Sequence, residues 1–281
     1  MQVGEPSRTA MAVARARAHH QVADEPRVFT DPLAVRIVGE AAIGASEFER
    51  GIDQDLARRR RLFIAARSRF ADDVVAAAVA RGTNQVVVLG AGLDTSAYRN
   101  THENVRFFEV DHPDTQQWKR RRLAEAEIAV PPSLTFAPID FEESTLAAGL
   151  AAAGLDRSSD ALFVWLGVVM YLTRASIDDT LRYIAGHGAA AEVVFDYLYP
   201  PSSAPHDVAA DDRQARADRV AAVGEPWLSF FTAEEIRDAL LSFGFTRIED
   251  RTATELLSAY GVGAAARPAN SVPHLVHAGT V

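Results

Sequence analysis

The chain has 281 residues, of which 48% are hydrophobic and 24% charged, a balance that argues against disorder, a collagen-like repeat or a coiled coil. It contains no cysteine, which excludes disulfides, zinc–thiolate sites and thiol nucleophiles. Its formal net charge of -9 argues against sequence-independent nucleic-acid binding, which needs clustered and uncompensated Lys and Arg.

The first 80 residues are predicted to form a helical N-terminal cap. Ser7–His20 and Pro32–Val38 read as two helices, and Asp53–Val79 reads as one long or broken helix. Residues 1–18 include four charged side chains and no apolar stretch of the kind that a secretory signal contains. The longest apolar run, Ala161–Leu172, is shorter than the ~18 to 20 residues of a membrane-spanning helix. We therefore expect a cytoplasmic protein that does not associate with membranes.

Residues 81–199 are predicted to form the cofactor-binding core. Five apolar runs alternate there with segments able to form helices, and alternation of this kind is typical of βαβ units in a doubly wound, mainly parallel sheet. The predicted strands are Gln85–Leu89, Val105–Val110, Leu134–Ile139, Ala161–Leu166 and Glu192–Phe195.

The alternation stops after residue 199. A proline-rich loop and a charged helical stretch, Asp207–Val223, predict a lid insertion over residues 200–230. Thr232 and Glu235 form the signature of a capping box that opens a helix, and Gly244 is placed to end it. Phe245–Glu249 and Leu275–Ala278 predict two final strands, so residues 231–281 complete one domain that covers the whole chain.

The segment most informative about function is the glycine turn Gly90-Ala91-Gly92, which directly follows a predicted strand. Glycine lets the backbone approach a ligand closely, and Asp111, 21 positions after Gly90, closes the next strand, where an acidic residue can reach a ribose diol. A dinucleotide fingerprint needs a third glycine at the position of Thr95. The pattern therefore favours a nucleoside cofactor without a pyrophosphate, and a tight turn with no ligand is the alternative.

Three segments of the chain resemble motifs of the leucine carboxyl methyltransferase family, and more narrowly those of its bacterial S-adenosylmethionine-dependent O-methyltransferases, some of which modify polyketides. They are Leu89–Arg99, Phe108–Pro113 together with Lys119, and Trp165–Thr173, within a likeness that runs from about Ser7 to Glu249. The resemblance implies a class I methyltransferase (Rossmann-like) fold and S-adenosyl-L-methionine as cofactor.

The resemblance also implies which positions bind the cofactor. Gly90 and Gly92 would lie against its methionine part, Asp111 would bind the ribose hydroxyls, and Asp140 with Phe141 would recognise adenine. Arg67 falls where the family holds the cofactor carboxylate. The full set of candidate cofactor-binding residues is Arg67, Gly90, Ala91, Gly92, Asp94, Asp111, His112, Asp140, Phe141 and Leu166.

Several of these positions have a second interpretation or depart from the family pattern. Leu166 stands where the family often has a glutamate, and Ser96 stands where an arginine is frequent. Asp94 is a candidate for the missing carboxylate contact, or else a plain helix N-cap. Arg67 is alternatively a solvated helix arginine, and replacing it with alanine is expected to weaken cofactor binding with little effect on the stability of the cofactor-free protein. The basic run Lys119–Arg122 is expected to be a solvated helix face.

The candidate catalytic residues are Tyr171, Tyr199 and His112. A carboxyl acceptor with a pKa near 4 is already ionised at pH 7, whereas a phenol must lose a proton to a base. Because neither His112 nor His206 has a strong claim to act as that base, we expect a carboxyl acceptor held by Tyr171 or Tyr199. A hydroxyl acceptor is the alternative.

The sequence thus predicts an O-methyltransferase acting on a carboxyl or hydroxyl oxygen of a small molecule, of the kind found in secondary metabolism. Two other functions fit the same turn: an NAD-dependent oxidoreductase on a Rossmann-like sheet, and a non-catalytic protein that binds a nucleoside cofactor. His and carboxylate residues do not cluster at metal-ligand spacing, so no metal site is predicted. We expect no nucleic-acid partner, and the sequence does not indicate an oligomeric state.

Overall fold

The structure is a computed structural model, and it describes residues 7–44, 48, 52–141, 143–200, 208–263 and 269–281. Its centre is a seven-stranded sheet in the order β3-β2-β1-β4-β5-β7-β6. The first five strands in sequence run parallel, and β7 lies antiparallel between β5 and β6. The strands are β1 (Gln85–Leu89), β2 (Arg106–Asp111), β3 (Leu134–Pro138), β4 (Ala161–Trp165), β5 (Ala191–Tyr197), β6 (Arg247–Thr252) and β7 (His274–Gly279). The predicted doubly wound, mainly parallel sheet is confirmed, including both final strands.

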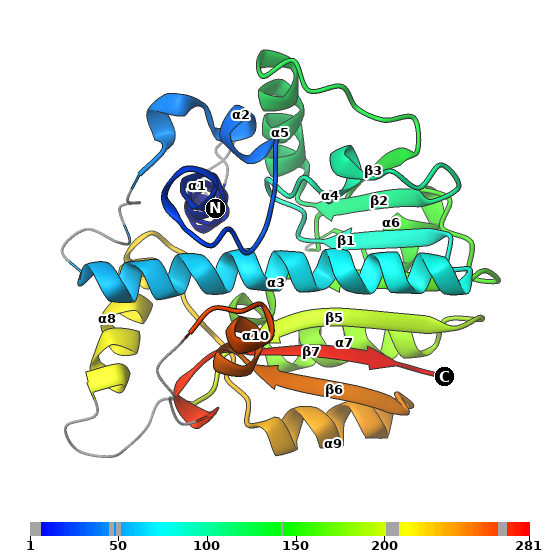
Figure 1. The fold of residues 1–281 in the computed structure, drawn as a ribbon. Coiled ribbons are helices and arrows are strands. Elements are labelled where there is room, and N and C mark those ends of the chain that lie inside the picture. The colour runs from blue at the N-terminus through cyan, green and yellow to red at the C-terminus, as the bar shows by residue number, and fades with distance from the viewer. Residues whose placement is uncertain (1–6, 45–47, 49–51, 142, 201–207, 264–268) are drawn as a thin grey trace.

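Helices cover both faces of this sheet (Figure 1). The long helix α3 crosses one face with α10 beside it, while α6, α7 and α9 cover the other. The helices α1, α2 and α8 lie beyond the carboxyl ends of the parallel strands. Their bounds are α1 (Arg8–Ala23), α2 (Ala34–Val38), α3 (Gln54–Arg81), α4 (Ser96–Arg99), α5 (Pro113–Glu125), α6 (Leu146–Ala152), α7 (Arg174–Ala185), α8 (Val208–Ala222), α9 (Ala233–Phe243) and α10 (Ala253–Ala259).

The strand residues alternate between two apolar cores. In β1, Val87 and Leu89 pack toward α6 and α7, whereas Val86 and Val88 pack toward α3. Successive side chains of a strand point to opposite faces, so a strand covered on both sides is mainly apolar at successive positions. All five residues of β1 and of β4 are buried, which explains the apolar runs Val86–Leu89 and Ala161–Trp165.

The helical segment α8 interrupts the alternation of strands and helices, as the sequence predicts. The proline-rich loop before it lies almost wholly outside the described residues. Within the part of the chain that the structure describes, none of the helices is both long and apolar enough to span a bilayer.

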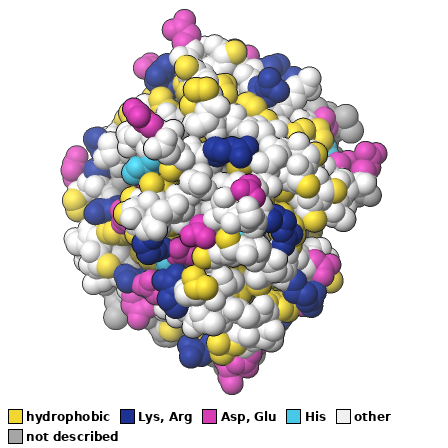
Figure 2. Space-filling model, turned by 90° about the vertical axis from the view of Figure 1, so that its right-hand side faces the viewer, with side chains coloured by type: hydrophobic (Ala, Val, Ile, Leu, Met, Phe, Trp, Pro, Cys, Tyr) yellow, Lys and Arg dark blue, Asp and Glu magenta, His cyan; other side chains and the backbone are white. Residues whose placement is uncertain are grey.

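The face at the amino ends of the parallel strands, on the right of Figure 1, carries charges of both signs. Figure 2 shows acidic and basic side chains interspersed across it, with apolar side chains in small groups between them. The surface on this side therefore does not gather charge of one sign.

The capping box that opens α9 gives a first prediction. The Thr232 hydroxyl accepts from the Glu235 amide at 3.1 Å, and the Glu235 carboxylate accepts from the Thr232 amide at 2.8 Å. Thr232→Ala should therefore lower the free energy of unfolding by about 1 kcal/mol in a urea titration. The exposed Thr246 provides a control, and equal losses for Thr232→Ala and Thr246→Ala would contradict the prediction.

Candidate active site

The glycine turn lies at the carboxyl end of β1, where ligands bind to doubly wound sheets. Gly90 and Gly92 both adopt positive φ angles, +63° and +44°, which residues other than glycine rarely adopt. A Cβ on Gly90 would lie 2.5 Å from Val168 Cγ2, and one on Gly92 would lie 3.2 Å from the Ala10 Cβ. The turn is therefore closely covered by the segment after β4 and by α1.

Asp111 ends β2 beside this turn. One of its carboxylate oxygens accepts from the Gly92 amide at 2.6 Å, and the other accepts from the His112 amide at 2.7 Å. Burial raises the pKa of Asp111, while these two amides and the charge of Lys119 act in the opposite direction. Each carboxylate oxygen has a second lone pair, so the group can still accept from a ribose diol.

The next candidates lie at the ends of β2 and β3. His112 is the N-cap of α5, and its Nδ1 accepts from the Asp114 amide at 3.2 Å. Its Nε2 lies 3.7 Å from the Asp140 carboxylate, so the structure brings these two side chains together. Phe141, the next residue, is 62% exposed, which is unusual for a phenylalanine and leaves its ring available to a ligand.

Arg67 is buried in α3, so the alternative of a solvated helix arginine is wrong. Its Nη1 donates to Asp196 Oδ2 at 2.5 Å, and the other oxygen of Asp196 accepts from the Gly167 amide at 2.6 Å. Asp196 lies near the end of β5, and a Cβ on Gly167 would lie 2.8 Å from Arg67 Nη2. Arg67 therefore lies at the carboxyl ends of β4 and β5, close to Leu166.

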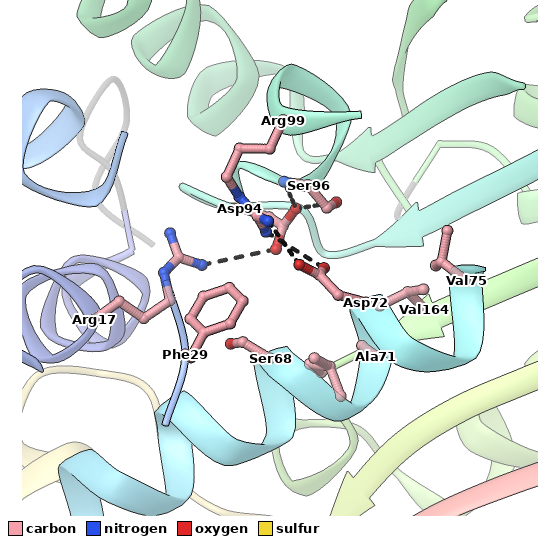
Figure 3. A pocket seen from close by; sticks show the side chains of 11 residues that line it. Arg17, Phe29, Ser68, Ala71, Asp72, Val75, Asp94, Ser96, Arg99 and Val164 are labelled. Atoms are coloured by element: carbon pink, nitrogen blue, oxygen red, sulfur yellow. Dashed lines mark hydrogen bonds and ion pairs between the residues drawn. The ribbon is translucent and has the colours of Figure 1, made fainter. Parts of the chain in front are cut away.

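A small cavity beside the glycine turn, here called the α3–β4 cavity, is lined by two of the predicted residues, Asp94 and Leu166. Asp94 Oδ1 accepts from the Ser96 amide, two residues further along, at 2.8 Å, and its Oδ2 lies 3.7 Å from Arg17 Nη1. Figure 3 shows Asp94 facing Arg17 and, beside it, Arg99 paired with Asp72. Burial would raise the pKa of Asp94, but Arg17 and Lys119 lower it below the usual value. Asp94 is thus an ionised group in the cavity wall, and its interpretation as a helix N-cap is wrong, because Thr95 is the N-cap of α4.

A second cavity, here called the α1–α8 cavity, contains the candidate Tyr171. It lies between α1, α3, α8 and the 3₁₀ helix η3 (Val169–Tyr171), and its lining residues are Thr9, Ala12, Val13, Ala16, Phe48, Arg60, Ile64, Tyr171, Arg216 and Val220. Tyr199 is not among the lining residues of either cavity; its ring stacks on His274 with centroids 5.3 Å apart. The two tyrosine candidates therefore occupy different surroundings.

Neither cavity has a histidine among its described lining residues, and His206 lies outside the residues that the structure describes. Among the residues that the structure describes, there is no group of three or more His, Asp or Glu side chains placed to hold a metal ion.

Sequence reasoning missed buried charges around the site. Lys119 is 1% exposed and its Nζ lies 2.8 Å from Glu109 Oε1, so the prediction of a solvated face is wrong at this position. Burial raises the pKa of Glu109 to about 7, although Lys119 opposes that shift. The arginine partner of Asp72 and the aspartate partner of Arg67 were missed as well, because each pair joins residues distant in the sequence.

A 3-2-1-4-5-7-6 sheet with β7 antiparallel, a glycine turn after β1 and an acidic residue at the end of β2 together define a class I methyltransferase fold. The model of the leucine carboxyl methyltransferase family matches residues 10–185, and the chain belongs to this family.

Named relatives agree with this assignment. The Bacillus subtilis protein named "Putative S-adenosyl-L-methionine-dependent methyltransferase YktD" is 30% identical over 87% of this chain and 88% of its own. A protein from a Mycobacterium species (strain JLS) with the same functional name is 31% identical over 92% of this chain and 88% of its own. The predicted family and enzyme class are thus confirmed.

Two solved structures share the fold. A "putative methyltransferase" from Thermobifida fusca has a TM-score of 0.59 at 17% identity and covers 99% of this chain and 96% of its own. A DUF574 family protein from Streptomyces avermitilis also has a TM-score of 0.59, at 15% identity, and covers 94% of this chain and 95% of its own.

Proposed function

We propose that the protein transfers the methyl group of S-adenosyl-L-methionine to a carboxylate oxygen of a small molecule. The observation that carries this proposal is the Asp111 carboxylate, held against the Gly92 amide at the carboxyl edge of the sheet in a chain of this family. Such a carboxylate fits a ribose diol, and glycine in the turn beside it lets a ligand approach the backbone more closely than a side chain would allow.

The candidate residues fit the two ends of this cofactor. Asp111, His112, Asp140 and Phe141 line the ends of β2 and β3, where an adenosine would lie. Near the glycine turn, two side chains of opposite charge, Asp94 and Arg67, suit the amino and carboxyl groups of the cofactor's methionine part.

The ionised Asp94 is placed to accept from the cofactor's ammonium group, with Leu166 in the same cavity wall. The Arg67 guanidinium has further donors beside the one given to Asp196, and a bidentate contact to a carboxylate is the favoured use of this group. Bound in this way, the cofactor supplies an electrophilic methyl group on a sulfonium.

The surroundings of Thr95 count against a dinucleotide. Its hydroxyl donates to Asp31 Oδ2 at 2.6 Å and accepts from Arg99 Nε at 3.2 Å, and Thr95 is 1% exposed. Thr95 is therefore buried against Asp31 of the N-terminal segment, and this packing in place of a third glycine supports the smaller nucleoside cofactor.

We choose a carboxyl acceptor because the described lining of the two cavities offers no histidine to act as a general base. No histidine of the described part of the chain lines either cavity, and His112 serves as a helix cap at the adenosine end. A carboxylate needs no base, because it is ionised at pH 7, and the Tyr171 hydroxyl in the α1–α8 cavity can donate a hydrogen bond to it. Catalysis then consists mainly of holding the two reacting atoms at attacking distance.

This choice predicts a flat pH profile. With acidic acceptors and labelled S-adenosylmethionine, the rate of methyl transfer should change less than about two-fold between pH 6 and pH 8, because an acid with a pKa near 4 stays ionised there. The product should release labelled methanol in alkali, as a methyl ester does. An alkali-stable ether, or a rate rising through a pKa near 6.5, would show a hydroxyl acceptor with a general base.

A further inference from the structure

The α1–α8 cavity is built from the same elements that cover the glycine turn. Thr9 and Ala12 line it, and Ala10 between them lies against Gly92. On the opposite wall, the Tyr171 amide donates to the carbonyl of Val168 at 2.9 Å, and Val168 lies against Gly90. The cavity therefore lies next to the two segments that cover the glycine turn.

The helix α8 closes the cavity and is held in place at its end. Glu225, just after this helix, accepts from the Arg8 amide at 3.0 Å, from the Thr9 amide at 3.2 Å and from the Ser7 hydroxyl at 3.0 Å. The Leu228 amide donates to the Met170 carbonyl at 2.7 Å. Backbone and side-chain contacts thus tie the lid to α1 on one side and to η3 on the other.

The lining of the α1–α8 cavity combines apolar side chains with positive charge. Most of its lining is apolar, and among the described lining residues the charged ones are two arginines, Arg60 from α3 and Arg216 from α8. The Arg216 guanidinium also lies over the ring of Trp227, 5.6 Å from its centroid. A guanidinium keeps its charge at any physiological pH and offers several donors, so it can bind an anion while retaining another contact.

The position of Arg60 along α3 sets where that anion would lie. Arg60, Ile64 and Arg67 recur at helical spacing and so share one face of α3. At 1.5 Å per residue, the seven positions from Arg60 to Arg67 correspond to about 10 Å along the helix axis. Arg67 lies at the strand ends beside Gly167, so the backbone of Arg60, in the cavity wall, is about 10 Å further from those strand ends along α3.

We propose that the α1–α8 cavity binds the methyl acceptor and that Arg60 and Arg216 hold an anionic group at the end remote from the methylated oxygen. This inference rests on the proposed function for the identity of the bound molecule as acceptor. The ligand class is an elongated apolar molecule with an acidic group at its far end, whose apolar body packs on Ala16, Ile64 and Val220.

The test uses two fluorescent probes that differ by one anionic group. Anilinonaphthalene sulfonate is apolar and anionic, and N-phenyl-1-naphthylamine has the same rings without the sulfonate. Titrated into the protein saturated with S-adenosylhomocysteine, the anionic probe should bind at one site about ten-fold or more tightly than the neutral probe.

Matched variants locate the binding. Arg60→Gln and Arg216→Gln should each lower the affinity for the anionic probe by about ten-fold or more and leave the affinity for the neutral probe unchanged. Arg237→Gln, an exposed site on α9 with the same change in charge, should alter neither. Val13→Phe, which fills the cavity, should weaken both probes.

Equal affinity of the wild-type protein for both probes, or unchanged binding of the anionic probe to Arg60→Gln and Arg216→Gln, would overturn the proposal. Displacement of the anionic probe by S-adenosylhomocysteine would also overturn it, because the probe would then occupy the cofactor site. Calorimetry of S-adenosylhomocysteine with the same variants should give wild-type affinity. Failure of the wild-type protein to bind that cofactor would instead count against the proposed function.

Discussion

Asp111→Ala is expected to weaken the binding of S-adenosylhomocysteine by roughly 10- to 150-fold. The carboxylate at the end of β2 would accept hydrogen bonds from both ribose hydroxyls, and loss of a charged hydrogen bond costs about 1.5 to 3 kcal/mol. The variant also leaves the Gly92 amide without its acceptor, which loosens the turn itself. Isothermal titration calorimetry on the folded variant measures the change directly.

Asp114→Ala is the control for this experiment, because Asp114 lies three positions away in the first turn of α5. It removes the same charge from the same region, and its affinity should stay within about two-fold of the wild-type value. If Asp111→Ala binds S-adenosylhomocysteine as tightly as Asp114→Ala does, Asp111 does not contact the cofactor.

Arg67→Ala should destabilise the cofactor-free protein by about 3 to 5 kcal/mol, because it leaves the buried carboxylate of Asp196 without its counter-charge. This reverses the expectation, drawn from the sequence, that the replacement would scarcely affect folding. Asp196 is 1% exposed and cannot gain compensating water without rearrangement. Urea unfolding of the cofactor-free variant measures the loss.

Two further variants separate the buried charge from other effects of this replacement. Arg67→Ala combined with Asp196→Asn should recover much of the lost stability, because the asparagine is neutral and its oxygen still accepts from the Gly167 amide. Arg69→Ala should cost about 1 kcal/mol or less, since the Arg69 side chain is 43% exposed. Equal losses for Arg67→Ala and Arg69→Ala would show that the pair with Asp196 contributes little.

The sheet could be predicted because its strands are buried on both faces. Runs such as Gln85–Leu89 then contain apolar residues at successive positions, which marks a strand without any knowledge of its neighbours. Strand ends were less predictable, because they depend on distant partners. β5 continues to Tyr197, two residues beyond the predicted end, since Asp196 and Tyr197 pair with Leu275 and His274 of β7.

The candidate site could be predicted only where a motif is local. Gly90, Gly92 and Asp111 stand at strand ends that the sequence already marks, and the structure brings Gly92 and Asp111 into contact. The second cavity could not be predicted, because its walls come from α1, α3, η3 and α8, four segments spread from Thr9 to Val220. Apolar residues at helical spacing indicate a packed face and do not reveal that a cavity lies beside it.

The partners of buried charges were hidden for the same reason. Arg67 and Asp196 are separated by 129 positions, and composition alone makes an arginine in a basic helix look solvated. His20 is likewise fully buried, with its two ring nitrogens in contact with Asp24 and with the amide of Phe29. Long-range pairing decides the surroundings of such groups, and local pattern does not report it.

The claim that the glycine turn binds S-adenosylmethionine is tested most directly by calorimetric titration of the wild-type protein with S-adenosylhomocysteine and, separately, with NAD⁺. The glycine turn and Asp111 are compatible with either cofactor, and only the contact of Thr95 with Asp31 favours the smaller one. We predict saturable binding of one S-adenosylhomocysteine per chain and no comparable heat from NAD⁺. Saturable NAD⁺ binding without binding of S-adenosylhomocysteine would contradict the account.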